Sequence, residues 1–344
     1  MSTLENIHIA SIDPIPSPHD LKSAHPLSIT LSNRVIETRQ HIRNIITKKD
    51  PRFLVVIGPC SIHDVNAALA YAERLAPFVK KYQKKCIIVM RVYFEKPRTT
   101  IGWKGLINDP DLDGSNRIEK GLKTARELLI SVLEMGIPTG TELLDPILPQ
   151  YYADTICWAS IGARTSESQT HREMASGLSM PIGFKNATDG NIEIALQAIE
   201  SARHSHTFIG VTQAGSIAKV SSKGNLDSHL IIRGGNNGPN YSSVQMAEHS
   251  DRIRELGIRA PILVDCSHGN SRKKAANQSK VLNSILNQRV AGNNAIIGAM
   301  IESFLVHGNQ PISPALVYGQ SITDECIDWE ETNALLAHIY DRLP

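Results

Sequence analysis

The sequence lacks the features that mark a secreted, membrane-spanning or nucleic-acid-binding protein. Its 36 Lys and Arg residues against 34 Asp and Glu leave a formal net charge of +2, which provides no general attraction to nucleic acid or to a membrane surface. No apolar run approaches the ~20 residues that a membrane helix needs. The five cysteines are odd in number and scattered, and the opening MSTLENIHIA has no basic-then-apolar secretion signal. We therefore expect a cytoplasmic protein with free thiols.

Internal repeats and low-complexity tracts are also absent, and a chain of 344 residues fits either one large α/β barrel or two ordinary domains. Residues 1–50 are polar, interrupted by prolines, and end in a stretch whose apolar residues recur at helical spacing. We interpret them as an irregular arm and one helix outside the main fold. From residue 51 to 344, short β-branched runs alternate with amphipathic stretches, a pattern typical of βα units around a parallel sheet.

Eight such β-branched runs predict a closed (β/α)8 TIM barrel rather than an open sheet. They are residues 52–57, 86–91, 138–142, 160–164, 181–185, 229–233, 261–265 and 295–302. One segment breaks the rhythm, because residues 208–228 alternate with a period near two around two glycines. We interpret it as an inserted β-hairpin before the sixth barrel strand.

Reactive or charged side chains follow all eight predicted strands. In strand order they are Cys60, Arg91, Glu142, Arg164, Lys185, Arg233, Asp265 with His268 three residues later, and Glu302. One charged residue at a strand end is commonly solvated, but eight on converging ends favour a site, because barrel active sites are assembled at the carboxyl ends of the strands.

Four of these strand-end residues are cations, namely Arg91, Arg164, Lys185 and Arg233. Like charges that converge in a nearly neutral protein are unfavourable unless an anion joins them. The second loop adds Lys96 and Arg98 around Pro97, with Thr99 next, a good phosphate-binding set for which an exposed basic turn is an equal alternative. Because these cations exceed what one phosphate needs, we expect two phosphorylated ligands, or one phosphate and a carboxylate.

The remaining residues at these ends suggest a metal site. A mixed set of sulfur, nitrogen and oxygen donors comprises Cys60, His268, Glu302 and, further along, Asp324. Such a set suits a divalent transition metal such as Mn, Fe, Co or Zn. The spacing is not a local motif, so a buried cysteine and solvated carboxylates are an equal alternative. His63 is a rival ligand, although a capping or supporting role beside Asp64 is favoured.

Six longer stretches identify a family. They are VVIGPCSIHD, VMRVYFEKPRTTIGWKGLINDP, SIGARTSESQTHREMASGLSMPIGFKNATDG, HLIIRGG, VDCSHGNS and GQSITDECIDWE. In matching order from about residue 30 to the C-terminus, they closely resemble the microbial class I 3-deoxy-D-arabino-heptulosonate-7-phosphate (DAHP) synthases. The NIHI arm, DPILPQYYAD and TQAG are most similar to the tyrosine-sensitive isoenzyme. The resemblance implies a (β/α)8 barrel with an N-terminal arm and an inserted hairpin.

The resemblance also implies a reaction. Phosphoenolpyruvate, D-erythrose 4-phosphate and water would give DAHP and inorganic phosphate, which opens the shikimate pathway to the aromatic amino acids. Motif by motif, the resemblance places one divalent metal on Cys60, His268, Glu302 and Asp324. It places phosphoenolpyruvate among Arg91, Lys96, Arg164, Lys185 and Arg233, and erythrose 4-phosphate on Arg98 and Thr99.

This assignment leads to a mechanistic hypothesis. The metal acts as a Lewis acid on the aldehyde, which carbon 3 of phosphoenolpyruvate attacks. Lys96 is the candidate proton donor to the developing alkoxide, and water adds at carbon 2 before phosphate departs. Glu142 or a residue linked to the metal is the candidate for activating that water. The arginines hold the substrates in line and offset their mutual repulsion.

The resemblance further implies feedback inhibition by an aromatic amino acid, bound far from the metal. By position, this pocket would involve Asn6, Pro149, Gln150, Leu178, Ser179, Phe208 and Val220. For Leu178, Phe208 and Val220, plain core packing is the alternative. Tyrosine is the expected effector, with phenylalanine and tryptophan open, because a few pocket residues can switch the choice. A pocket that spans subunits implies a homodimer or homotetramer.

Two other functions fit parts of the pattern. A metal-independent Schiff-base aldolase would use Lys185 as its nucleophile. A non-catalytic phosphate-binding protein would use the same barrel without chemistry, since a fold does not fix a function. The complete set of four metal donors argues against the binding protein, which has no evident need for all of them.

Overall fold

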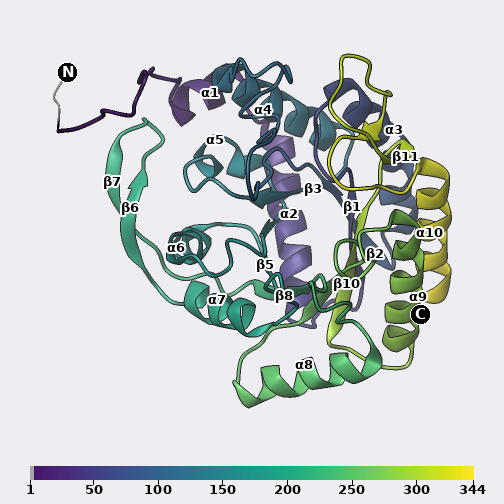
Figure 1. Cartoon of the computed structure of the whole chain (residues 1–344). Helices are drawn as coiled ribbons and strands as arrows, with labels where there is room; N and C mark the ends of the chain where they lie inside the picture. Colours follow the sequence, from purple (N-terminus) through teal and green to yellow (C-terminus); the bar gives the residue numbers. More distant parts are fainter. Residues whose placement is uncertain (1–3) are drawn as a thin grey trace.

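Eight parallel strands close into a barrel in the computed structural model, which describes residues 4–344 (Figure 1). The strands are β1 (Phe53–Gly58), β2 (Cys86–Arg91), β3 (Thr139–Leu143), β4 (Trp158–Ile161), β5 (Ile182–Lys185), β8 (Ser228–Ile232), β9 (Ile262–Asp265) and β10 (Ile296–Glu302). Around the barrel their order is β1-β10-β9-β8-β5-β4-β3-β2. All eight are buried throughout, as strands covered on both faces should be. The predicted α/β barrel is thus confirmed.

Helices form an outer ring around these strands (Figure 1). They are α3 (Val65–Tyr82), α4 (Ile118–Glu134), the short α5 (Pro149–Tyr152), α6 (Gln169–Gly177), α7 (Glu193–Arg203), α8 (Ser243–Glu255), α9 (Gln278–Val290) and α10 (Trp329–Arg342). At the start of several helices, the side chain of the preceding residue accepts a hydrogen bond from a backbone N–H of the first turn. Asp64, for example, accepts a hydrogen bond from the Ala67 amide at the start of α3, which satisfies one free helical N–H.

The fourth strand ends earlier than the sequence pattern predicts. β4 ends at Ile161, and the chain then turns, because the amides of Thr165 and Ser166 both donate to the Gly162 carbonyl. Arg164 therefore lies in the loop after the strand rather than at its end. Loops at this edge of a barrel face its mouth. Arg164 is therefore still expected to lie near the residues at the other strand ends.

The N-terminal segment contains α1 (Pro18–Ala24) and α2 (Ile29–Ile46). The second helix precedes the eight βα units, and it packs directly against the barrel strands. Its buried residues Val35, Ile42 and Ile46 share one apolar cluster with Leu54 of β1 and Leu263 of β9. α2 therefore lies across the amino-terminal end of the barrel (Figure 1), where its apolar stripe closes the core.

Truncating the buried face of α2 should destabilise the whole barrel. We expect Ile42→Ala to lower the free energy of unfolding by about 2–5 kcal/mol, because Ile42 is fully buried and its loss leaves a cavity. Ile36 lies on the same helix but is 61% exposed, so Ile36→Ala should change stability by less than ~0.5 kcal/mol. Urea denaturation of both variants measures the difference. Equal stabilities would contradict the role given to α2.

Two smaller sheets lie outside the barrel. β6 (Thr207–Val211) and β7 (Ile217–Ser221) form an antiparallel pair in the segment predicted as a hairpin, residues 208–228, with β6 beginning one residue earlier. The pair projects away from the barrel (Figure 1). After β10, the short strands β11 (Val306–Asn309) and β12 (Gln320–Ser321) pair in parallel. This second pairing, which the sequence did not predict, returns the chain to the barrel mouth at Asp324. Within residues 4–344, no helix has the length and apolar character required to cross a membrane.

Candidate active site

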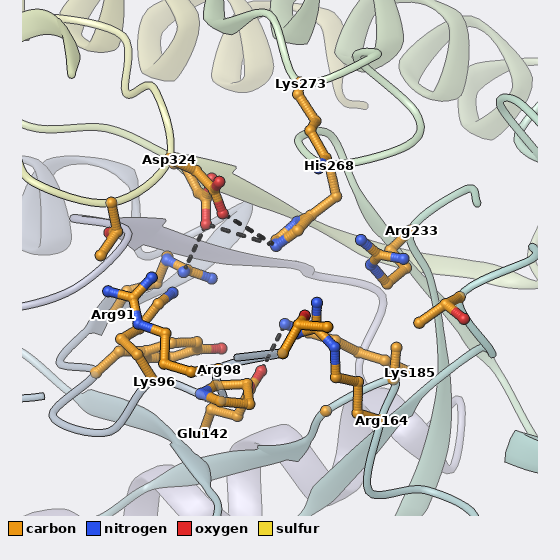
Figure 2. Close-up of a pocket in the computed structure, with 18 of the residues that line it drawn as sticks. Arg91, Lys96, Arg98, Glu142, Arg164, Lys185, Arg233, His268, Lys273 and Asp324 are labelled. Carbon is orange, nitrogen blue, oxygen red and sulfur yellow. Dashed lines mark hydrogen bonds and ion pairs between the residues drawn. The ribbon is translucent and has the colours of Figure 1, made fainter. Parts of the chain in front are cut away.

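A polar cavity of about 320 Å³ opens at the carboxyl ends of the barrel strands. The predicted residues that line it are Arg91, Lys96, Arg98, Thr99, Glu142, Arg164, Lys185, Arg233, His268, Glu302 and Asp324. Figure 2 shows the labelled members of this set converging on one space from several strands and loops. Cys60 is fully buried beside it, and its Sγ lies 3.7 Å from Oδ2 of Asp324. The barrel thus brings together residues that are more than 250 positions apart in the sequence.

The two deepest cations are each paired with a carboxylate. Nη2 of Arg91 lies 3.1 Å from Oε1 of Glu302, and Nζ of Lys185 lies 2.6 Å from Oε2 of Glu142. Burial by itself would raise the pKa of Glu142, but Lys185 and Lys96 outweigh it and lower the pKa to about 2. The Lys185–Glu142 pair is therefore charged at neutral pH.

The cations nearer the mouth are not paired in this way. Within the described chain, the guanidinium groups of Arg98, Arg164 and Arg233 make no ion pair; Nε of Arg98 donates to the Trp103 carbonyl at 2.7 Å. Arg98 and Arg164 are exposed and Arg233 is half-buried. These three guanidinium groups line the cavity and have no ion-pair partner among residues 4–344, which suits phosphate or carboxylate ligands.

Four potential metal donors meet at one side of the cavity. Ligand atoms of Cys60, Glu302 and Asp324 all lie within 4.8 Å of one another. Nε2 of His268 lies 3.9 Å from Oε1 of Glu302 and 4.0 Å from Oδ2 of Asp324. This set of thiol, imidazole and two carboxylates fits a divalent transition metal.

His268 is held in place from behind. Its Nδ1 lies 2.9 Å from Oδ2 of Asp265 and 2.7 Å from Oγ of Ser267. Asp265, predicted at the end of the seventh strand, is fully buried and does not line the cavity. A carboxylate on Nδ1 leaves Nε2 free to face the other donors, as ligand histidines in metal sites are commonly oriented.

Cys60 and Lys96 are electrostatically coupled. Burial, and then the carboxylates Glu302 and Asp324, raise the pKa of the Cys60 thiol to about 12. A thiol of this kind keeps its proton at neutral pH until a cation displaces it. Nζ of Lys96 lies 3.1 Å from the Cys60 Sγ. Burial would lower the pKa of Lys96, but Cys60, Asp324 and Glu302 raise it above its ordinary value, so Lys96 is an ammonium at neutral pH.

His63, the rival ligand, lies elsewhere. Its ring packs edge-on against Phe304 at 6.2 Å, and it lines a separate cavity beside Asp64 and Val65. In contrast, Tyr93, Thr188 and Lys273 line the site although the sequence pattern did not single them out. Lys273 follows the VDCSHGNS stretch in the loop after β9, so a count of cations in whole loops, not only at strand ends, would have found it.

The residues expected to bind an effector are only partly gathered. Pro149, Gln150, Leu178 and Ser179 line a second cavity of about 300 Å³, together with Gln213 from the hairpin connection. Phe208 and Val220 face each other across the hairpin and do not line this cavity, nor does Asn6 of the arm. Both hairpin residues are half-buried and lie outside the main apolar cluster, so core packing does not account for them.

Known proteins of one family are similar to this chain along nearly its whole length. The sequence profile of the DAHP synthetase I family matches residues 28–337. Phospho-2-dehydro-3-deoxyheptonate aldolase, Tyr-sensitive, from Escherichia coli K12 is 49% identical over 343 residues, which cover 99% of this chain and 96% of that protein. The Trp-sensitive aldolase of Salmonella typhimurium is 48% identical over 338 residues, covering 98% and 97%. A phospho-2-dehydro-3-deoxyheptonate aldolase from Corynebacterium glutamicum is 47% identical over 347 residues, covering 98% and 94%.

Solved structures support the same conclusion. The phospho-2-dehydro-3-deoxyheptonate aldolase of Francisella tularensis SCHU S4 superimposes with a TM-score of 0.95 at 48% identity, covering 97% of this chain and 98% of that one. The corresponding Thermotoga maritima enzyme, with a TM-score of 0.56 at 21% identity, covers 85% and 68% and shares the fold. The barrel, the convergent site and these full-length similarities together show that the chain belongs to the DAHP synthetase I family.

Proposed function

We propose that the chain condenses phosphoenolpyruvate with erythrose 4-phosphate and water to form DAHP and inorganic phosphate, the first step of the shikimate pathway. One observation carries the proposal: six predicted cations converge on a single cavity beside a thiol, an imidazole and two carboxylates. The relatives named above are phospho-2-dehydro-3-deoxyheptonate aldolases, and the two substrates together carry two phosphates and a carboxylate. The cavity offers cations for all three groups.

The depth of the cations suggests where each substrate binds. Arg91, Lys96 and Lys185 are the less exposed cations of the cavity. Together with Arg164 and Arg233 nearer the mouth, they would hold the phosphate and carboxylate of phosphoenolpyruvate. Arg98 and Thr99 lie on the exposed loop after β2 and would bind the phosphate of erythrose 4-phosphate. With both anions fixed, the alkene carbon and the aldehyde are held for reaction, which replaces a collision by a positioned encounter.

Cys60, His268, Glu302 and Asp324 would hold one divalent metal from among Mn, Fe, Co and Zn. When bound, such a metal supplies Lewis acidity to a carbonyl oxygen. Lys96, kept protonated by its anionic neighbours, lies 3.1 Å from Cys60 Sγ and would donate a proton to the alkoxide that forms from the aldehyde. Arg91 would offset the charge of Glu302, to which it is already paired.

Glu142 is a weak candidate for the base that activates water. Although burial opposes ionisation, its pKa stays at about 2 because Lys185 and Lys96 are close, and a carboxylate this acidic accepts a proton poorly at neutral pH. We therefore assign Glu142 to the orientation of Lys185. A residue linked to the metal cluster is then the remaining candidate for the base that activates the water.

The Schiff-base alternative requires Lys185 as a neutral amine. Burial would lower the pKa of Lys185, but Glu142, 2.6 Å away, and the nearby Tyr93 raise it above its ordinary value. This is the opposite of the perturbation that activates a lysine nucleophile. We expect no covalent trapping of substrate by borohydride.

Phosphate release from phosphoenolpyruvate tests the proposed reaction. We expect release only when erythrose 4-phosphate is present, its loss after thorough chelation, and its return on addition of Mn²⁺. Mass spectrometry of the product should give the mass of DAHP. Undiminished release after chelation would favour the Schiff-base mechanism, and no release with any metal would favour a phosphate-binding protein.

We further propose inhibition by an aromatic amino acid, with tyrosine as the effector, in a homodimer or homotetramer. The cavity at Pro149, Gln150, Leu178 and Ser179 supports this, and Asn6, Phe208 and Val220 would complete it where a neighbouring subunit's arm meets the hairpin. Large apolar side chains are exposed on both segments, with Ile7 at 66% and Ile209 at 84%, as expected of surfaces that pack in an assembly. Assays with tyrosine, phenylalanine and tryptophan separately identify the effector.

A further inference from the structure

Lys273 is a seventh cation at the cavity. It lies in the loop after β9, five residues beyond His268, and its side chain lines the same cavity as the six predicted cations. Figure 2 shows it extending beside His268, on the side of the site where Asp324 lies. It is close enough to Asp324 to interact electrostatically with that carboxylate.

The backbone of this loop places Lys273 specifically. Both Arg272 and Lys273 have left-handed φ angles of +55° and +58°, a conformation that residues with a Cβ adopt rarely. The Lys273 amide donates to the His268 carbonyl at 2.7 Å, which ties the two residues together. The next side chain diverges, because Nζ of Lys274 lies 3.4 Å from Oε1 of Glu325 and does not line the cavity.

The charge of Lys273 is not held by a close ion pair with any carboxylate among residues 4–344. Its side chain is exposed. An ammonium held at a cavity edge without a carboxylate is available to an anionic ligand. This distinguishes it from Arg91 and Lys185, which are buried and already paired.

Charge neutrality supports the same conclusion. The two substrates together carry about five negative charges, nearly two on each phosphate and one on the carboxylate. The six predicted cations and one divalent metal, set against Cys60 as thiolate, Glu142, Glu302, Asp324 and the buried Asp265 behind His268, leave roughly three positive charges. The positive charge of Lys273 reduces the remaining deficit.

Its position at the mouth selects the substrate. Four of the five expected partners of phosphoenolpyruvate are buried or half-buried, the exception being Arg164, whereas Lys273, Arg98 and Thr99 are all exposed. We propose that Lys273 binds the phosphate of erythrose 4-phosphate and so helps to select a phosphorylated aldehyde. This inference rests on the proposed function.

The test is the effect of Lys273→Asn on the KM values of the two substrates. Asn tolerates left-handed φ angles, so this variant removes the charge and preserves the loop. We expect the KM for erythrose 4-phosphate to rise about ten- to a hundred-fold, as for loss of one charge-assisted hydrogen bond. The KM for phosphoenolpyruvate should change less than about twofold. Lys273→Arg, which keeps a cation, should restore most of the loss.

Lys274→Ala is the matched control, since it removes the adjacent lysine that faces away from the cavity. Normal turnover by the wild-type chain and by this control would establish the reaction independently of Lys273. Unchanged KM values in Lys273→Asn, an equal rise for both substrates, or a rise for phosphoenolpyruvate alone would overturn the assignment. If Lys273→Asn lost its urea unfolding transition, Lys273→Met would be measured in the same way.

Discussion

Replacing Cys60 with Ala is expected to lower kcat for condensation by about a thousandfold while the chain stays folded. Cys60 contributes the only sulfur to a donor cluster in which it, Glu302 and Asp324 lie within 4.8 Å of one another. Loss of this ligand should prevent stable metal binding, and metal polarisation of a carbonyl contributes several kcal/mol, or about a factor of ten per 1.4 kcal/mol. The measurements are phosphate release and the metal content after dialysis.

Cys86→Ala provides the control for this prediction. Cys86 is also buried, but it lies at the start of β2, at the opposite end of the barrel from the cavity. This variant should keep one metal per chain and nearly full activity. A Cys60→Ala protein that retained both metal and turnover would show that the cluster is not the metal centre.

Lys185→Met is expected to remove activity. It should also lower the free energy of unfolding by about 3–5 kcal/mol at pH 7, because the Glu142 carboxylate is then left buried without its ion-pair partner. The Lys185 Nζ lies 2.6 Å from Glu142 Oε2, and both side chains are nearly inaccessible to solvent. The double variant Lys185→Met with Glu142→Gln removes both charges. It should recover most of the stability but none of the activity.

The stability difference should depend on pH in a defined window. In the folded chain, the pKa of Glu142 is about 2 against an ordinary 4.5, so its contribution is full above pH 4.5 and is lost as the pH falls toward 2. The pKa of Lys185 is raised above its ordinary 10.5, so its contribution is full below that pH and is lost as the pH rises beyond it. Urea unfolding of the wild type and Lys185→Met should therefore differ most between about pH 4.5 and 10.5. A difference that grew below pH 4 would contradict the pairing.

Much of the barrel was predictable because buried parallel strands appear as short apolar runs with charged ends. Arg91, Lys185 and Asp265 each end the strand that the sequence assigns to them. Since the strands of a barrel run parallel, the predicted list of strand ends was also a list of neighbours. This is why Cys60 and Glu302, far apart in the chain, could be assigned to one site. Asp324 follows no barrel strand, and its assignment depended on the family resemblance.

Other features depend on tertiary contacts that have no local signal. The apolar stripe of α2 predicts a helix, but only the barrel interior provides the surface on which Ile42 and Val35 are buried. The inward direction of Lys273 arises from left-handed backbone angles and its hydrogen bond to His268. A sequence of two adjacent lysines gives no indication that one faces the cavity and the other pairs with Glu325.

A crystal structure with Mn²⁺ and phosphoenolpyruvate would test the central claim most directly, through the anomalous scattering of the metal. We predict one strong anomalous peak within ligand distance of Cys60 Sγ, His268 Nε2 and the carboxylates of Glu302 and Asp324. Phosphoenolpyruvate should lie beside it, with its anionic groups on Arg91, Lys96, Arg164, Lys185 and Arg233. A metal bound away from Cys60, or phosphoenolpyruvate bound outside this cavity, would contradict the account.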